Sequence, residues 1–145
     1  MQLNVMRALS KDLARIESSY GLYDGSGNFW TAEEPQSGSI VGMIGVQSVS
    51  QNAAEIRRMS VANSLQRQGI GTLLLEHAER WCLEQSFEFV NLTTLSNMTG
   101  SCNFYEASGY VEDFRESYPS KAKVLPEQSQ MIHYKKKLVQ NSDQA

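Results

Sequence analysis

The chain has 145 residues, enough for one domain with a substantial core and too few for two ordinary domains. A formal net charge of −3 gives no general electrostatic reason to bind nucleic acid or an anionic membrane. No apolar run approaches the roughly 18 residues of a membrane-spanning helix, and the N-terminus lacks the basic-then-apolar pattern of a signal peptide. We therefore expect a cytoplasmic protein without nucleic-acid or membrane partners, folded as one domain over residues 1–139 with a disordered tail at 140–145.

The first half of the chain alternates apolar and β-branched runs with short turns. Ser10 stands where a helix N-cap is needed, ahead of apolar residues at helical spacing. A cluster rich in glycine, at residues 21–28, interrupts that helix and forms a loop. The elements expected in this half are a strand at 3–9, a helix after Ser10, and strands at 29–32, 39–46 and 55–62.

The second half begins with a helix at residues 72–85, whose apolar face carries Ile70, Leu74, Ala78 and Trp81. A β-branched and aromatic strand at 87–94 follows, as expected of a central strand with a parallel neighbour. Gly109 suits the left-handed position that ends a helix. The remaining elements are a helix at 100–107, strands at 110–114 and 130–138, and between them an irregular stretch at 115–129.

Cysteine and histidine are sparse and widely separated. Cys82 and Cys102 fall in helical segments without a Cys-x-x-Cys pattern, so we expect two small buried apolar residues and no metal site. His77 and His133 lie within periodic elements, which favours structural or surface roles over catalysis.

The most informative segment lies between the strand at 55–62 and the helix that follows it. It reads Gln66-Arg67-Gln68-Gly69-Ile70-Gly71. Glycines let the backbone approach a ligand closely, and a helix start offers unpaired N–H groups and partial positive charge. This chemistry favours an anionic ligand, most simply a pyrophosphate; the alternative is a tight turn that only admits the chain to the helix.

The spacing Gln-x-x-Gly-x-Gly is neither the Walker nor the Rossmann pattern. It is preceded by Arg-Arg-Met-Ser-Val at 57–61 and followed by Leu-Leu-Leu-Glu-His-Ala at 73–78, and Asn-Phe-Tyr-Glu-Ala-Ser-Gly-Tyr occupies 103–110. These motifs resemble the GNAT superfamily of N-acetyltransferases over essentially residues 2–138. Glu-Ile-Arg-Arg-Met-Ser-Val together with Asn-Phe-Trp-Thr-Ala-Glu most resembles its camello-like branch, whose members are commonly membrane-anchored, although we expect no such anchor here.

The resemblance implies an α+β fold with a mixed, mostly antiparallel central sheet, a parallel pair that splays apart at its centre, and helices on both faces. It implies acetyl-CoA as co-substrate, with the pyrophosphate on backbone N–H groups of residues 67–71 and the pantetheine along residues 59–61. The family often has a CoA-binding asparagine seven residues before the tyrosine that corresponds to Tyr105. This position is Met98 here, so either Asn97 or Asn103 is expected to make that contact. The residues expected to bind acetyl-CoA are Met59, Ser60, Val61, Gln66, Arg67, Gln68, Gly69, Ile70, Gly71, Thr72, and Asn97 or Asn103.

Two residues are expected to carry acetyl transfer to an amine. By the resemblance, Tyr105 matches the family tyrosine that protonates the departing thiolate. A phenol is suited to this role, since a phenol and an alkyl thiol have comparable pKa values. Glu55 stands eleven residues before Gln66, a separation similar to that of the catalytic glutamate in histone-acetylating members. A free glutamic acid has a pKa of about 4.3 and an alkylammonium about 10.4, so such a base works through ordered water or needs a raised pKa. Arg57, on the same face, would oppose that rise.

Three functions remain open at this stage. The first is an N-acetyltransferase in which a primary amine of a small molecule, a lysine or an N-terminus attacks the thioester directly. The second is a catalytically inactive CoA-binding sensor or interaction module. The third is a globular module in which the glycines only form a turn. Because one helix fits between the first two strands where the family has two, we expect an open acceptor pocket or one completed by a second copy, as in a homodimer.

Overall fold

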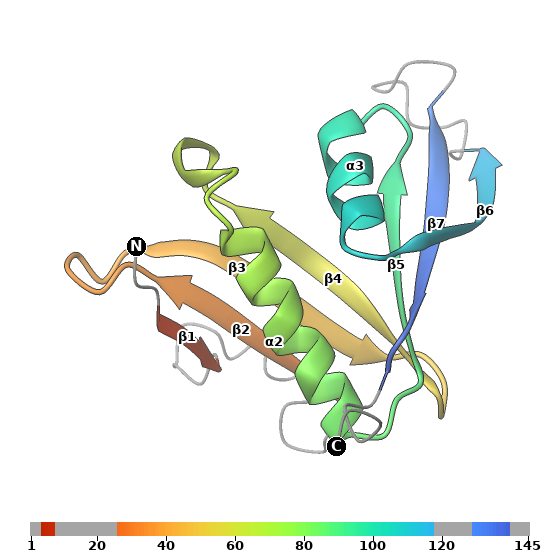
Figure 1. The fold of residues 1–145 in the computed structure, drawn as a ribbon, viewed down its shortest axis with the longest axis horizontal. Helices are drawn as coiled ribbons and strands as arrows, with labels where there is room; N and C mark the ends of the chain where they lie inside the picture. Colours follow the sequence, from red (N-terminus) through yellow and green to blue (C-terminus); the bar gives the residue numbers. More distant parts are fainter. Residues whose placement is uncertain (1–3, 8–25, 118–128, 140–145) are drawn as a thin grey trace.

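The computed structural model describes residues 4–7, 26–117 and 129–139, which form one seven-stranded sheet with two α-helices. The strands run in the order β1-β2-β3-β4-β5-β7-β6 across the sheet (Figure 1). The elements are β1 (Asn4–Arg7), β2 (Gly27–Glu33), β3 (Ile40–Ser48), β4 (Ala53–Val61), a short 3-10 helix η2 (Asn63–Leu65), α2 (Ile70–Glu84), β5 (Phe89–Leu95), α3 (Thr99–Ala107), β6 (Val111–Ser117) and β7 (Gln130–Lys137).

Five of the six strand pairs are antiparallel, and the single parallel pair, β4 with β5, lies at the centre. Its ladder covers only three residues, from Ala53 opposite Phe89 to Glu55 opposite Asn91. Beyond that point the two strands diverge, as Figure 1 shows. We call the resulting V-shaped opening the splay. The expected mixed sheet with a splayed parallel pair is confirmed.

Helix α2 lies across β2, β3 and β4 and buries the stripe Ile70, Leu74, Ala78 and Cys82 against them (Figure 1). Gly42 on β3 permits this close packing, because a Cβ there would lie 2.9 Å from Leu74 Cδ1. The helix begins at Ile70, two residues earlier than expected, since Gly69 already takes the left-handed conformation that precedes it. Trp81 lies at the margin of the buried stripe, where its ring meets Trp30 edge to face.

Helix α3 lies on the same face of the sheet as α2. The contacts of Phe104 with the start of α2 and of Tyr110 with Glu79 of α2 establish this placement. Gly109 follows the helix with φ of 95°, as expected for a helix-ending glycine. The helix expected after Ser10 and the tail at 140–145 fall outside the described residues.

One expectation about the C-terminal strands needs correction, and their order in the sheet is a further finding. The strand expected at 110–114 continues to Ser117, so residues 115–117 are strand and not irregular; the rest of that stretch up to 128 lies outside the described residues. Strand β7 inserts between β5 and β6, so the last strand in sequence is not the edge strand. Backbone ladders decide this order, and periodicity alone does not reveal it.

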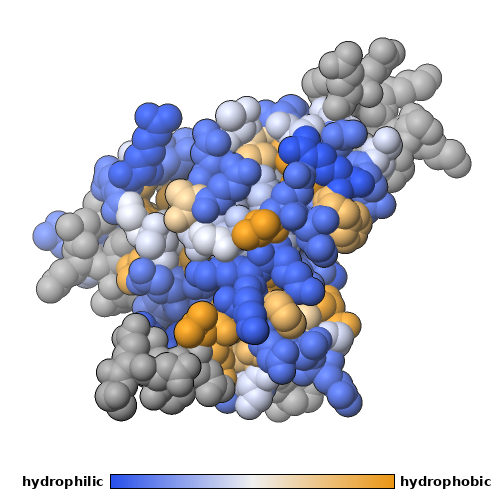
Figure 2. Space-filling model, turned by 45° about the vertical axis from the view of Figure 1, so that its right-hand side comes forward, coloured by the Kyte–Doolittle hydropathy of each residue, from blue (hydrophilic) through white to orange (hydrophobic). Residues whose placement is uncertain are grey.

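Both cysteines are free and buried, as expected, and burial, with a smaller effect of Glu79, raises the pKa of Cys82 to about 12. On the surface shown in Figure 2, hydrophobic residues form small separate patches among hydrophilic ones. Among the described helices, none is long and apolar enough to cross a membrane. Among the described residues, no cluster of three His, Cys, Asp or Glu is arranged to hold a metal ion.

Candidate active site

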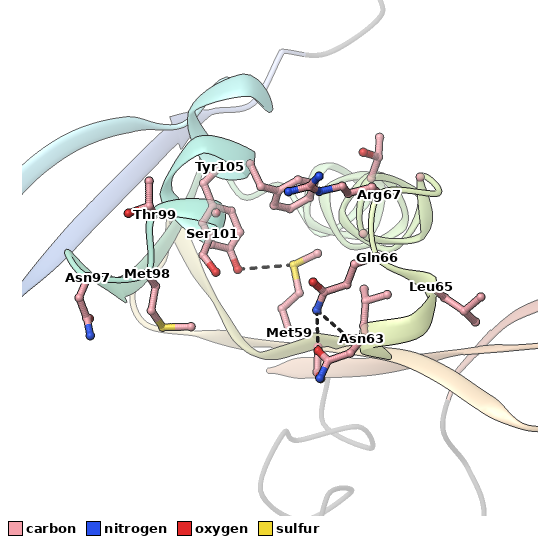
Figure 3. Close-up of a pocket in the computed structure, with 17 residues that line it drawn as sticks. Met59, Asn63, Leu65, Gln66, Arg67, Asn97, Met98, Thr99, Ser101 and Tyr105 are labelled. Carbon is pink, nitrogen blue, oxygen red and sulfur yellow. Dashed lines mark hydrogen bonds between the residues drawn. The ribbon is translucent and has the colours of Figure 1, made fainter. Parts of the chain in front are cut away.

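A cavity of about 900 Å³ opens where β4 and β5 diverge, between the N-terminal ends of α2 and α3. Figure 3 shows Met59 between Tyr105 of α3 and the loop that carries Asn63 and Gln66. The cavity is lined by Met59, Ser60, Val61, Asn63, Leu65, Gln66, Arg67, Gly69, Gly71, Thr72, Asn97, Met98, Thr99, Gly100, Ser101, Phe104 and Tyr105.

The start of α2 forms one wall of the cavity and presents unsatisfied N–H groups to it. Gly69 precedes the helix with φ of 84°, no side chain caps the first turn, and that turn holds no acidic residue. Arg67 also has a positive φ, of 69°. Changes of backbone handedness of this kind turn successive N–H groups toward one point and make anion-binding concavities. This wall is therefore suited to phosphate, with the Arg67 guanidinium beside it.

Strand β4 forms the floor and is distorted where it enters the splay. Its pairing with β3 shifts register between Met43 and Gly45, and Arg58 takes a φ of 53°, which is uncommon for a residue with a side chain. The extra residue turns Met59 to the same face as Ile56, toward α3. Since the β4–β5 ladder ends at Glu55, the β5-facing backbone groups of residues 59–61 have no partner on β5, and apart from the Val61 carbonyl, which accepts from Gln66 Nε2, they are available to a ligand.

Tyr105 lies at the inner end of the cavity. Its hydroxyl donates to Met59 Sδ at 3.6 Å, and its ring packs edge to face against Phe104 and Tyr110. Burial, and to a lesser extent Cys102, raises the pKa of Tyr105. The phenol therefore keeps its proton at neutral pH and can donate it.

Most residues expected to bind the cofactor meet at this cavity. The expected cofactor-binding residues that line it are Met59, Ser60, Val61, Gln66, Arg67, Gly69, Gly71, Thr72 and Asn97, and Tyr105, the expected proton donor, lines it too. Gln66 also fixes the loop, because its amide donates to Asn63 Oδ1 at 3.1 Å and to the Val61 carbonyl at 3.3 Å.

Four of the expected residues do not line the cavity. Gln68 is exposed to solvent and does not line the cavity. The Ile70 side chain is buried in the core, so Ile70 can contribute only its backbone N–H, at the first residue of α2. Asn103 points to solvent from α3, and the structure therefore places Asn97, not Asn103, at the cavity.

Glu55 is the fourth. It belongs to the last rung of the β4–β5 ladder, on the face of the sheet opposite α2 and α3, and its carboxylate lies 3.7 Å from the Arg57 Nε. Tyr105 and Glu55 therefore stand on opposite faces of the sheet at the point where it opens. Among the described residues that line the cavity, none is an aspartate, a glutamate or a histidine.

Sequence reasoning missed the contribution of the α3 start. Met98, Thr99, Gly100 and Ser101 line the cavity opposite the start of α2, and η2 adds Asn63 and Leu65. The run of small residues at 99–101 carried a usable signal, since small side chains at a helix start leave room for a ligand.

The fold and this cavity have counterparts among known proteins. Residues 6–110 match the model of the acetyltransferase (GNAT) family, and the chain belongs to that family. Acetyl-CoA is the co-substrate of the family, in agreement with the expectation drawn from the glycine turn. No observation bears on the camello-like branch.

Two curated relatives share part of the chain. YxbD of Bacillus subtilis (strain 168) is 33% identical over 90 residues, which cover 61% of this chain and 55% of that protein. A streptothricin acetyltransferase of Escherichia coli is 28% identical over 71 residues, which cover 49% of this chain and 41% of that protein. The chain thus spans about half the length of the curated relatives it matches.

Solved structures share the fold over almost the whole chain. A GNAT acetyltransferase of Staphylococcus aureus Mu50 superposes with a TM-score of 0.76 at 24% identity, covering 95% of this chain and all of that one. A Bacillus anthracis (strain Ames) protein crystallised with acetyl coenzyme A gives 0.81 at 18% identity, covering 96% and 100% of the two chains. A GNAT acetyltransferase of Elizabethkingia anophelis with acetyl-CoA bound gives 0.74 at 18%, covering 94% and 98%.

Proposed function

We propose that this protein transfers the acetyl group of acetyl-CoA to a primary amine by direct attack of the amine on the thioester. One observation carries the proposal: a single cavity joins the uncapped start of α2 to the half-buried hydroxyl of Tyr105 at the splay. An anion-binding helix start and a proton donor at opposite ends of one cavity are what a long phosphorylated thioester requires. The streptothricin acetyltransferase relative and the acetyl-CoA complexes support this reaction class.

The cofactor's phosphates would bind at the start of α2, on the N–H groups of residues 67–71 and the Arg67 side chain. The pantetheine would lie along β4 and pair with the backbone of residues 59–61, which β5 leaves unpaired. Asn97 and the small residues at the start of α3 form the facing wall. This arrangement holds the thioester near Tyr105 and accounts for every wall of the cavity.

Acetyl transfer forms a C–N bond and breaks the C–S bond. As the tetrahedral intermediate collapses, the thiolate of CoA leaves and Tyr105 gives it a proton. The raised pKa of Tyr105 keeps the phenol protonated until that moment. A separate group must remove a proton from the incoming ammonium.

We assign Glu55 to the acceptor side of the reaction. Its carboxylate lies on the face opposite the cofactor cavity and can attract and hold a cationic amine at the splay. Its carboxylate also lies 3.7 Å from the Arg57 Nε, on that same face.

A second candidate is a CoA-binding module without catalysis, because the described part of the cavity lining supplies no acidic or imidazole side chain. Calorimetric titration with acetyl-CoA, followed by a CoA-release assay over lysine, spermidine and streptothricin, separates the two. Saturable binding with turnover of at least one amine supports the transferase. Binding without turnover of any of them supports the module, and no binding by the folded protein rejects both.

A further inference from the structure

The face of the sheet opposite α2 and α3 carries a set of polar residues beside the splay. Strand side chains alternate between the two faces, and Ile56, Leu92 and Tyr134 point into the core beneath the helices. Their neighbours along each strand therefore point to the opposite face. The residues on that face of β4, β5, β7 and β6 include Glu55, Arg57, Asn91, Thr93, His133, Lys135, Phe114 and Glu116.

Three of these residues form a continuous hydrogen-bonded chain. Thr93 Oγ1 lies 2.9 Å from His133 Nδ1, and His133 Nε2 lies 2.6 Å from a carboxylate oxygen of Glu116. Phe114 stacks on the imidazole with ring centroids 4.1 Å apart and planes 13° from parallel. Because a carboxylate only accepts, Nε2 carries the proton and Nδ1 accepts from the Thr93 hydroxyl. Glu116 and Phe114 thus fix both the tautomer and the ring plane.

The threonine end of this chain lies at the splay. The last rung of the ladder joins Glu55 to Asn91, and counting past the bulge at Arg58 brings Met59 level with Thr94, the neighbour of Thr93 on β5. On the face that carries α3, Met59 Sδ accepts a hydrogen bond from the Tyr105 hydroxyl. Thr93 lies two residues beyond the last rung on the face opposite Tyr105, so an amine that enters the splay from that face would pass beside it.

One acceptor atom at the vertex, by which we mean the closed end of the splay at Glu55 and Asn91, has no partner among the described residues. Asn91 Oδ1 is buried and accepts no hydrogen bond from the described residues, and Asn91 stands in register with Glu55. Buried polar atoms without a partner are rare, and an ammonium bound at the vertex would supply the missing donor. Glu55 and Asn91 would hold this ammonium beside Thr93.

We propose that Thr93, His133 and Glu116 form the proton relay that deprotonates the acceptor amine, with Thr93 touching the amine and His133 receiving the proton through it. This inference rests on the proposed acetyl transfer. Imidazole is the side chain whose charge changes in the physiological range, so it accepts a proton at neutral pH more readily than a carboxylate does. Among the described residues of these strands, the charged groups that share its face are Glu116 on β6, Lys135 and Lys137 on β7, and Glu55 and Arg57 on β4.

The protons balance along this route. The ammonium passes one proton to Thr93 Oγ1 while the threonine hydroxyl proton moves to His133 Nδ1. The neutral amine then attacks the carbonyl carbon. When the C–S bond breaks, Tyr105 gives its proton to the thiolate, the nitrogen loses its second proton to solvent, and Tyr105 takes a proton from solvent in turn. His133 returns its proton to solvent before the next cycle.

The test compares two nucleophiles in the wild-type protein and in His133→Gln. One is the best alkylamine among lysine, spermidine and streptothricin; the other is hydroxylamine, which is largely unprotonated at neutral pH and needs no base. We expect kcat/KM for the alkylamine to fall by about 10²-fold, within the range for loss of a general base, with hydroxylamine turnover and acetyl-CoA affinity unchanged. The defect should shrink as pH rises, because free amine accumulates.

Thr93→Val removes the hydroxyl, keeps the β-branched shape and should reproduce this pattern, and it decides the question if His133→Gln does not fold. Lys137→Gln, on the same face of β7 but away from the relay, is the matched control. An unchanged alkylamine rate, an equal loss for both nucleophiles, or a defect that does not vary with pH would overturn the relay. A wild-type protein that turns over no alkylamine would instead overturn the proposed function, and the relay with it.

Discussion

The Tyr105 hydroxyl lies 3.6 Å from Met59 Sδ and has no other hydrogen-bond partner among the described residues. A thioether is a weak acceptor, so the phenol is lightly held and free to turn toward a stronger one. The thiolate of CoA, bound beside Met59, would be such an acceptor. The pair therefore marks the end of the cavity where the C–S bond would break.

Replacing Tyr105 with phenylalanine should lower kcat by about 10²-fold or more, because the departing thiolate loses its proton donor. Acetyl-CoA affinity should not change, since the ring and its packing remain. Because burial raises the pKa of Tyr105, wild-type activity should not decline through loss of this proton below about pH 10, the usual value for tyrosine. Steady-state rates across pH and calorimetry check both points, and an unchanged kcat would remove Tyr105 from the mechanism.

Replacing Gly100 with tryptophan should abolish measurable acetyl-CoA binding without unfolding the protein. Gly100 lies in the first turn of α3 and lines the cavity, and a Cβ added there would meet no heavy atom within 4 Å. Any side chain there improves helix propensity by up to about 1 kcal/mol relative to glycine. Gly100→Ala is the matched control, expected to bind acetyl-CoA and to melt no lower than wild type. Normal binding by the tryptophan variant would place the cofactor elsewhere.

Replacing Gly42 with alanine should destabilise the fold by about 1–3 kcal/mol through overpacking. The new Cβ would lie 2.9 Å from Leu74 Cδ1 and 3.2 Å from both Ile70 Cγ2 and the Ser60 carbonyl oxygen. Chemical denaturation of both proteins measures the difference. A variant as stable as wild type would mean that α2 does not pack this closely on β3.

Cys82 should make the protein less stable in alkali. Its pKa rises from an ordinary 9.0 to about 12, so the folded state keeps a proton that the unfolded state loses. The resulting stabilisation is complete below pH 9.0 and disappears as pH rises through about 12. The free energy of unfolding of the wild type should therefore fall more steeply over this range than that of Cys82→Ala. The titration of buried tyrosines affects both proteins equally, so it cancels in the comparison. If the free energies of unfolding of the two proteins fell in parallel with pH, Cys82 would not have the raised pKa that its burial causes.

Several parts of the fold followed from local patterns. Gly109 predicted the end of α3, since only glycine accepts its φ without strain, and the aromatic, β-branched run after α2 predicted a central strand with a parallel partner. The glycine turn predicted the helix start that now lines the cavity. In each case the physical cause lies within a few neighbouring residues.

Other features could not be predicted from the sequence, because they depend on contacts between segments that are far apart in it. Whether Asn97 or Asn103 faces the cavity depends on the direction of α3, and the insertion of β7 between β5 and β6 depends on pairing across about 40 residues of sequence, as between Thr93 and His133. His133 was expected to be structural or superficial, because nothing in its own segment signals Thr93 or Glu116.

The sequence by itself indicated the family, the order of the described elements and the glycine turn before α2, because glycine conformations, helix starts and strand periodicity are set by short-range sterics and hydrogen bonding. The tertiary structure alone decided which side chains meet. The bulge at Arg58 turns Met59 toward Tyr105, and the end of the β4–β5 ladder leaves Glu55 on the opposite face. Such meetings arise from strand register and helix packing, and these are fixed only when distant segments bury their apolar surfaces together.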